Sequence, residues 1–250
     1  MKNYRKHLNF IFAILLYVAF FYFVITRVGD RLDFSSYIDY RMLLFKGWLR
    51  TIAVSILGVL LSLIVGLVLY FMQQIKRFPF LHSLAEIHKT IIFGTPLIVI
   101  AIVAYYFIGT AFNINSRMFI GVMTLGLYIG AYIADIYKGA IESIHINQWQ
   151  TAKMFGFTKY QTYRYIIFPQ VLKSILPPLA GQFALTIKGS ALLSYMALNE
   201  FLNEVNVVQA ISYDVMEGFI ILSIGYWLIT VPLIVAVRRF ENKLHVRVVK

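Results

Sequence analysis

The sequence predicts an all-α integral membrane protein with about six transmembrane helices. Hydrophobic residues make up 60% of the 250-residue chain, only 14% are charged, and the mean hydropathy is +0.75. Apolar runs of about 20 residues recur along the chain, and this is the length that a helix needs to cross a hydrocarbon layer of about 30 Å. Strands of a membrane barrel would be shorter and would alternate apolar with polar residues, so the runs favour helices.

The first apolar run covers residues 8–26. It is longer and more evenly apolar than the core of a cleaved signal peptide, and no small-residue cleavage site occurs in the following ITRVGDR. We therefore expect a retained signal-anchor helix. The other predicted spans are residues 48–72, 85–108, 118–137, 176–198 and 218–237.

The distribution of lysine and arginine predicts the orientation, because translocation across the membrane disfavours positive charge in short loops. With the N-terminus in the cytoplasm, most basic residues fall on the cytoplasmic side, and the C-terminus is cytoplasmic too. The cytoplasmic set is Lys2, Arg5, Lys6, Lys76, Arg77, Lys89, Lys138, Lys153, Lys159, Arg164, Lys173, Arg238, Arg239, Lys243, Arg247 and Lys250. The outer set is Arg27, Arg31, Arg41, Lys46, Arg50 and Arg117. The net charge of +12 then fits basic loops facing anionic lipid better than it fits nucleic-acid binding.

The sequence carries no motif of an enzyme or of a metal protein. It has no cysteine, its five histidines are scattered without an H-E-x-x-H pattern, and neither G-x-S-x-G nor the phosphate-binding G-x-x-x-x-G-K-[ST] occurs. We therefore expect no catalytic residue, no metal and no cofactor, and we expect any ATP hydrolysis to take place on another chain.

The longest polar interruption, NQWQTAKMFGFTKYQTYRYIIFPQ, covers residues 147–170 on the predicted cytoplasmic side. Two short helices are expected within it. Asn147 and Gln150 can cap the first helix reciprocally, and Gly156 supplies a left-handed exit. Thr158 and Gln161 begin the second helix, and that helix is expected to end near Pro169.

Each of these short helices has one face that could contact something else. Trp149, Ala152 and Gly156 share a face of the first helix, and Tyr160, Tyr163 and Ile167 share a face of the second. Aromatic and basic segments of this kind often lie at the lipid interface. Alternatively, small residues leave room for a partner surface and the neighbouring aromatics anchor it. The residues alone leave both alternatives open.

Three polar features lie within the predicted spans. Lys188 costs about 2.5 kcal/mol or more in the membrane, so it either reaches an interface, lines a translocation path or pairs with Asp135. Asp135 alternatively pairs with Lys138 near the membrane surface. The triplet Gly94-Thr95-Pro96 is expected to interrupt its helix, either for packing or to present backbone groups to a substrate.

Several motifs in the same order resemble those of the permease subunits of type I ABC importers, specifically the polar amino acid group. NQWQTA followed by Gly156 is similar to G-Q-x-E-A-A-x-x-x-G, FGTPLIV to R-G-T-P-L-L-V, and GAYIADIYKGAIESI to A-A-Y-I-A-E-I-x-R-G-A-I-x-S-I. IKGSALLSYMALNEF is similar to L-K-D-T-S-L-x-S-x-I-x-x-x-E-L. The resemblance covers about residues 47–241. It implies a permease core at 47–250, with a cytoplasmic coupling loop at about 138–175, preceded by an extra anchor helix and external loop at 1–46.

The resemblance implies a subunit that moves polar amino acids into the cell by alternating access, in the bacterial cytoplasmic membrane. The expected partners are cytoplasmic ABC ATPase subunits, a second permease copy or close relative, an extracytoplasmic solute-binding protein and membrane lipid. The implied ATPase-docking residues are Gln148, Trp149, Gln150, Thr151, Ala152 and Gly156. The candidate translocation path comprises Gly94, Thr95, Pro96, Asp135, Lys188 and Ser190.

The chain departs from the family pattern at three charged positions, where Gln150 replaces a glutamate, Phe93 replaces an arginine and Gly189 replaces an aspartate. A glutamine can still cap a helix, but it cannot form an ion pair with the ATPase. Two other functions therefore remain open. One is a membrane scaffold or sensor that keeps the permease fold and moves no solute, and the other is a permease of the same family for another small solute.

Overall fold

The computed structural model describes residues 2–29, 32–75 and 77–246, and these residues form helices and short connections with no strand among them. The α-helices are α1 (Lys2–Val28), α2 (Ser35–Asp39), α3 (Arg41–Gln74), α4 (Pro79–Gly94), α5 (Leu97–Val103), α6 (Arg117–Glu142), α7 (Ile146–Met154), α8 (Lys159–Gln161), α9 (Phe168–Gly189), α10 (Phe201–Ser212) and α11 (Val215–Val246). Two π-helical segments, Ala104–Gly109 and Thr162–Ile167, continue α5 and α8, and a 3₁₀ segment, Ser190–Met196, continues α9.

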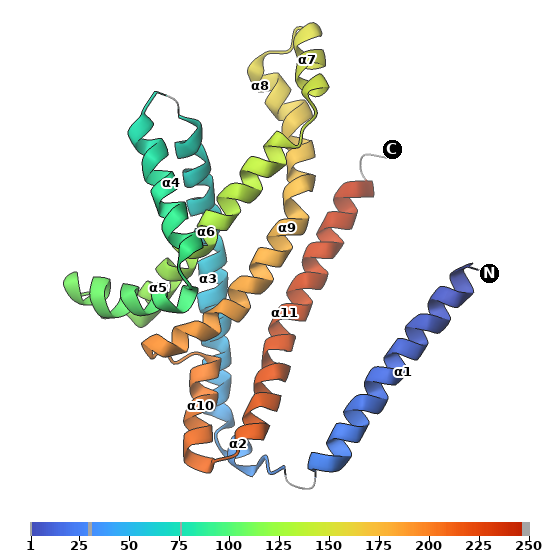
Figure 1. The fold of residues 1–250 in the computed structure, drawn as a ribbon, viewed down its shortest axis with the longest axis vertical. Coiled ribbons are helices and arrows are strands. Elements are labelled where there is room, and N and C mark those ends of the chain that lie inside the picture. Colours follow the sequence, from blue (N-terminus) through green and yellow to red (C-terminus); the bar gives the residue numbers. More distant parts are fainter. Residues whose placement is uncertain (1, 30–31, 76, 247–250) are drawn as a thin grey trace.

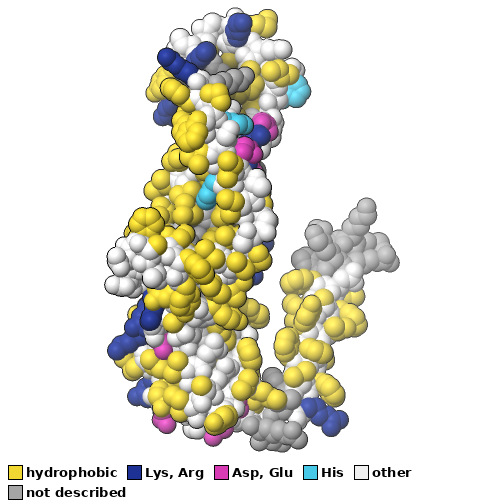
Figure 2. All heavy atoms as spheres, turned by 60° about the vertical axis from the view of Figure 1, so that its left-hand side comes forward, with side chains coloured by type: hydrophobic (Ala, Val, Ile, Leu, Met, Phe, Trp, Pro, Cys, Tyr) yellow, Lys and Arg dark blue, Asp and Glu magenta, His cyan; other side chains and the backbone are white. Residues whose placement is uncertain are grey.

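The body is elongated, with α3, α6, α9 and α11 running along most of its length (Figure 1). The α7–α8 pair (residues 146–167) and the connection between α3 and α4 lie at one end, and the turn between α10 and α11 lies at the other. Apolar side chains cover the middle of the body in Figure 2, and lysines and arginines are prominent at its upper end. This distribution is that of a protein whose middle is surrounded by lipid.

The structure confirms the all-α membrane architecture. Three helices in the described part of the chain are long and apolar enough to cross a membrane, namely α3, α6 and the 215–240 portion of α11. The bent pair α4 and α5 adds a fourth candidate. Residues 8–24 of α1 form a shorter apolar helix. The total of six spans stays a prediction.

The centre of the body is a close crossing of α3 and α6, which depends on glycine. A Cβ atom added at Gly126 would lie 2.5 Å from the Leu61 side chain, and one added at Gly66 would lie 2.7 Å from that of Ile133. Small residues allow membrane helices to approach closely and to gain dispersion contacts along their length. Substitution of either glycine by a larger residue would therefore push α3 and α6 apart.

The predicted span 85–108 is not one straight helix. The axes of Pro79–Gly94 and Leu97–Gly109 differ by 113°, and Thr95 between them is extended with φ −126° and ψ 129°. Proline lacks the backbone N–H and forces the preceding residue away from helical geometry, so the break falls at Thr95-Pro96 as predicted. Residues 85–108 were expected to cross the membrane as one span, and the structure shows two steeply angled helices instead.

The prediction that the second polar helix ends near Pro169 is wrong. The π-helical segment Thr162–Ile167 runs directly into α9, with Pro169 in the first turn of that helix. The wider π-helical turn accommodates Pro169, which has no backbone N–H to donate to a regular helical ladder. The predicted span 176–198 accordingly begins at Phe168 as an α-helix and ends as the 3₁₀ segment Ser190–Met196.

The α1 helix stands apart from the body (Figure 1), and its side chains from residue 8 to residue 24 are all exposed. The segment after it is held to the start of α11. The Asp33 N–H donates to Glu217 Oε1 over 3.0 Å, the Ser36 hydroxyl to Asp214 Oδ2 over 3.0 Å, and the Tyr37 hydroxyl to the Asp214 carbonyl over 2.6 Å. Burial and the nearby Asp214 and Glu217 carboxylates raise the pKa of Tyr37.

Candidate functional site

The first helix of the α7–α8 pair has well-formed ends. Its N-cap is His145, whose Nδ1 accepts the Asn147 N–H over 3.2 Å, so the predicted reciprocal capping by Asn147 and Gln150 is wrong. The helix begins earlier, at Ile146, and Asn147 already lies within its first turn. At the other end Gly156 has φ +73°, and its predicted role as a left-handed exit is confirmed.

The second helix begins as predicted, with a capping box formed by Thr158 and Gln161. It packs back on α7, and the rings of Trp149 and Tyr163 meet edge to face at 5.3 Å. Ala152 is buried. The small side chain of Ala152 is therefore used within the chain and does not leave room for a partner, as the sequence had suggested.

The opposite face of α7 is open. Helical spacing places Gln150, Thr151 and Met154 away from Ala152, and all three are exposed, with Met154 at 87%. Phe155, at 76% exposed, adds an apolar side chain beside them. A protruding helix with exposed glutamine, methionine and phenylalanine side chains offers both hydrogen bonds and apolar contact to another molecule.

Asp135 is paired, but not with either predicted lysine. Its Oδ1 lies 2.5 Å from Nζ of Lys89, so the proposed pairs with Lys188 and Lys138 are wrong. Lys89 also does not belong to a cytoplasmic loop, because it lies within α4 and is buried. The packing of α4 against α3 and α6 brings the two side chains together.

This pair is asymmetric in its exposure. The Lys89 side chain is 9% exposed, whereas that of Asp135 is 46% exposed. The ammonium group also lies 5.8 Å from the centre of the Phe93 ring. The location of Lys89 inside the apolar run 85–108 was the signal that could have identified this partner.

The remaining residues of the candidate path fall beside the break. The Leu97 side chain lies over Gly189, so the start of α5 meets the end of α9. Ser190 is buried there and its hydroxyl donates to the Ile187 carbonyl over 2.7 Å. Lys188 is exposed and lines a pocket of about 320 Å³. The other lining residues of that pocket are Ala191, Phe219, Leu222, Ser223, Tyr226 and Trp227.

Sequence reasoning missed Glu200, a fully buried carboxylate that joins three helices. Its Oε1 caps α10 by accepting the Asn203 N–H over 3.0 Å. Its Oε2 accepts the hydroxyls of Thr51 in α3, over 3.0 Å, and of Tyr226 in α11, over 3.1 Å. Thr51 in turn accepts the Phe201 N–H over 3.0 Å. Glu200 therefore sets the spacing of α3, α10 and α11.

A second acidic residue, Glu204, lies one turn further along α10 and is also buried. Its Oε1 lies 3.0 Å from Nη1 of Arg50, which also donates to the Asn199 carbonyl. Only 11 acidic residues occur in the whole chain, and Glu200 and Glu204 are separated by one helical turn. This spacing in an apolar region was the available signal.

The broken span, the hydrogen-bonded carboxylate between helices and the exposed α7 together describe a membrane-embedded helical protein with a protruding helix at one end. The comparison with known proteins identifies the family. Residues 58–246 match the family described as the binding-protein-dependent transport system inner membrane component, and the chain belongs to this family. It is the permease subunit of an ABC importer, and this family works with a separate ATPase and a binding protein.

Relatives of known description cover most of the chain. The glutamine transport system permease protein GlnP of Escherichia coli K12 is 30% identical over 82% of this chain and 94% of its own length. The probable glutamine ABC transporter permease protein GlnM of Bacillus subtilis is 28% identical over 85% of this chain and 94% of its own.

Solved structures share the fold. The crystal structure of an amino acid ABC transporter with histidines superposes with a TM-score of 0.77 at 28% identity, covering 85% of this chain and 99% of that one. An inward-facing structure of the MetNI methionine ABC transporter has a TM-score of 0.67 at 16% identity, covering 82% and 98%, and supports the fold alone.

Proposed function

We propose that this chain imports polar amino acids across the bacterial inner membrane by alternating access, driven by ATPase subunits that bind α7. The substrate class is supported by the relatives named for glutamine and by the amino acid transporter whose structure is similar. In this proposal the end that carries α7 faces the cytoplasm, both termini lie on that side, and two permease copies or close relatives assemble, since two ATPases need two docking helices.

The exposed face of α7 is the observation that carries the proposal. Gln148, Gln150 and Thr151 contact the ATPase directly, and Met154 adds apolar contact. The other implied docking residues, Trp149, Ala152 and Gly156, do not contact the ATPase in this proposal. They fix the position of α7 on the second helix. Since position 150 is a glutamine, the contact there is a neutral hydrogen bond and depends less on salt than an ion pair would.

The translocation path in this proposal runs past the broken span. The Gly94–Pro96 break leaves backbone groups without regular helical partners, and such groups can bind polar substrates in transporters. In this proposal the Asp135 carboxylate, which is half-exposed and paired with Lys89, and the exposed Lys188 ammonium group are two separate polar points along the path. Ser190 supports the path from within by bonding to the end of α9.

The test is ATP-dependent uptake of labelled glutamine and other amino acids into proteoliposomes that contain this chain, its ATPase and its binding protein. Met154→Arg should abolish ATPase binding and uptake while leaving membrane insertion intact. Tyr213→Arg is the matched control, because it adds the same charge at an 84% exposed position at the opposite end and should keep ATPase binding.

Different failures separate the alternatives. ATPase binding without uptake of any amino acid would contradict the transport proposal and favour a scaffold. Uptake of another small solute would leave the permease assignment in place and overturn the substrate class. Equal ATPase binding by wild type and Met154→Arg would contradict docking at α7.

A further inference from the structure

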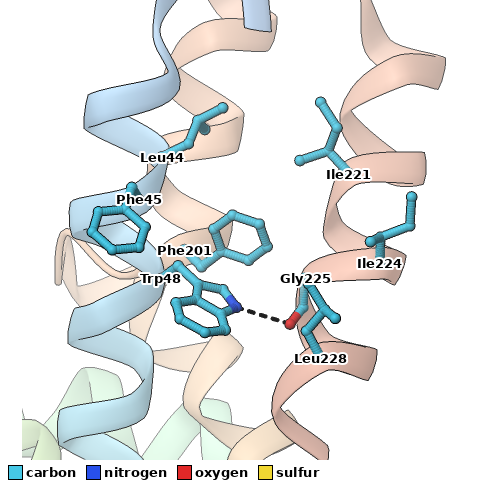
Figure 3. A pocket seen from close by; sticks show the side chains of 8 residues that line it. All are labelled: Leu44, Phe45, Trp48, Phe201, Ile221, Ile224, Gly225 and Leu228. Carbon is cyan, nitrogen blue, oxygen red and sulfur yellow. Dashed lines mark hydrogen bonds between the residues drawn. The ribbon is translucent and has the colours of Figure 1, made fainter. Parts of the chain in front are cut away.

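An apolar groove lies between α3 and α11 near the end of the molecule opposite α7. Figure 3 shows α3 side chains on one wall, α11 side chains on the other, and Phe201 between them. The volume of the groove is about 360 Å³. Its lining residues are Leu44, Phe45, Trp48, Phe201, Ile221, Ile224, Gly225 and Leu228.

The groove is built into the packing of the two helices. The Trp48 indole N–H donates to the Gly225 carbonyl over 2.9 Å and holds α3 and α11 together at its floor. A Cβ atom at Gly225 would overlap the Phe201 ring, so only glycine lets the ring enter between the helices. Trp48 also stacks on Phe45 with the ring centres 6.3 Å apart. The walls are therefore fixed by contacts within the chain.

A positive charge lies above the groove on the same face of α3. Arg41 precedes Leu44 and Phe45 by three and four residues, and Trp48 follows Phe45 by three, so all four side chains share one stripe. Arg41 is exposed, and one N–H of its guanidinium donates to the Ile38 carbonyl over 3.0 Å. The other N–H groups of a guanidinium suit a phosphate.

The acidic residues at the start of α11 are hydrogen-bonded to the segment after α1 and form no ion pair with Arg41. Glu217 is buried and accepts the Asp33 N–H, and Asp214 accepts the Ser36 hydroxyl. Among the described side chains, no carboxylate lies within 4.0 Å of the Arg41 guanidinium. Within the described part of the chain, the exposed Arg41 guanidinium is therefore left without a carboxylate in contact.

We propose that the groove binds an anionic glycerophospholipid, with an acyl chain between α3 and α11 and the headgroup phosphate on Arg41. The other candidate occupant of the groove is α1, which ends shortly before α3 in the sequence. Its charge disfavours it. The α1 sequence contains no acidic residue and has Arg27 in its last turn, so its insertion would add a cation beside Arg41. A phosphate neutralises Arg41, and its acyl chain matches the apolar walls.

Tryptophan quenching by lipids that carry bromine on the acyl chain tests the proposal, because Trp48 lines the groove. A variant with Trp149→Phe and Trp227→Phe leaves Trp48 as the only tryptophan. The reference variant, with Trp48→Phe, Trp149→Phe and Lys188→Met, leaves Trp227, which is 71% exposed on α11, and removes the exposed cation that lines a pocket with it. Each variant is reconstituted in phosphatidylcholine with increasing brominated phosphatidylglycerol or brominated phosphatidylcholine.

The Trp48 variant should be half quenched at about a fivefold lower fraction of the anionic lipid than of the zwitterionic one, as expected for one cationic contact. Trp227 should show no preference. Arg41→Gln should remove the preference at Trp48. Lys46→Gln is the matched control, because it removes an exposed charge at similar depth on another face of α3 and should leave the preference unchanged.

Three results would overturn the proposal. Equal preference at Trp48 and Trp227 would mean that only the general lipid annulus is sensed. Preference that survives Arg41→Gln would place the headgroup elsewhere. Lack of quenching at Trp48 by either lipid would mean that α1 or a second copy covers the groove. The comparison of the two single-tryptophan proteins decides even if Arg41→Gln does not fold.

Discussion

The crossing of α3 and α6 and the α7–α8 pair differ in almost every physical respect. The crossing is buried, and glycines such as Gly126 let the two long helices approach closely. The α7–α8 pair lies at one end of the molecule and leaves Met154 and Phe155 in the open. The first region can stabilise the fold without any partner, whereas the second exposes apolar area that only a partner would bury.

This difference predicts which substitutions should change the stability of the chain and which should change its coupling to the ATPase. Changes at the buried helix contacts, such as the α3–α6 crossing, should lower the stability of the isolated chain and affect function only through folding. Changes on the outer face of α7 should leave the stability of the chain unaltered and impair its cooperation with the ATPase. The following predictions test this separation, in order of decreasing expected effect.

Glu200→Ala should destabilise the protein most. It removes the α10 cap and leaves the buried hydroxyls of Thr51 and Tyr226 without their acceptor, at a combined cost of about 3 kcal/mol. Thermal unfolding in detergent would measure the loss. Glu200→Gln keeps the shape and one acceptor oxygen and should cost much less; equal destabilisation by both variants would mean that the carboxylate geometry matters in another way.

Gly126→Leu should open the α3–α6 crossing and lower the free energy of unfolding by about 2 kcal/mol, because the new side chain would collide with Leu61. Gly139 in the same helix is the matched control, since no atom lies within 4 Å of an added Cβ there. Gly139→Leu should unfold at nearly the wild-type temperature. A similar loss in both variants would show that glycine in α6 matters for a reason other than packing.

Lys89→Met should reduce uptake more than it reduces stability. The change leaves Asp135 without its ammonium partner, but this half-exposed carboxylate can still be solvated, so we expect a cost of about 1 kcal/mol rather than that of a fully buried pair. Thermal unfolding and uptake would be measured on the same preparation. The double variant Lys89→Met, Asp135→Asn should recover stability, and failure to do so would contradict the importance of the pair.

His145→Ala should have the smallest effect, about 0.5–1 kcal/mol, because it removes one N-cap bond at the exposed start of α7. Hydrogen exchange of the first turn of α7 would detect the loosening. Thr158→Ala is the comparison at the second helix and should loosen that start instead. Faster exchange at both helices in either variant would mean that the α7–α8 pair opens as one unit.

The features that could be predicted from the sequence are those that depend on neighbouring residues. Apolar runs predicted the long apolar helices α3, α6 and α11, and Thr95-Pro96 predicted the break. Gly156 and the Thr158–Gln161 box predicted the ends of the α7–α8 helices. Each is set within one or two turns of chain, where backbone sterics and local hydrogen bonds decide.

The contacts between distant residues could not be predicted in the same way. Lys89 meets Asp135 only through the packing of α4 on α6, and Glu200 meets Thr51 and Tyr226 only through the packing of three helices. The helix end predicted near Pro169 was wrong because the preceding π-helical turn allows the helix to continue. In each case tertiary packing overrides the local pattern.

Cross-linking to the ATPase tests the central claim most directly, because the chain has no cysteine of its own. Single-cysteine variants Gln150→Cys on the outer face of α7 and Tyr213→Cys at the opposite end would be treated with a thiol–amine cross-linker in the assembled transporter. The account predicts that Gln150→Cys links to the ATPase and that Tyr213→Cys does not. An ATPase adduct at position 213, or none at position 150 while ATP-driven uptake persists, would contradict it.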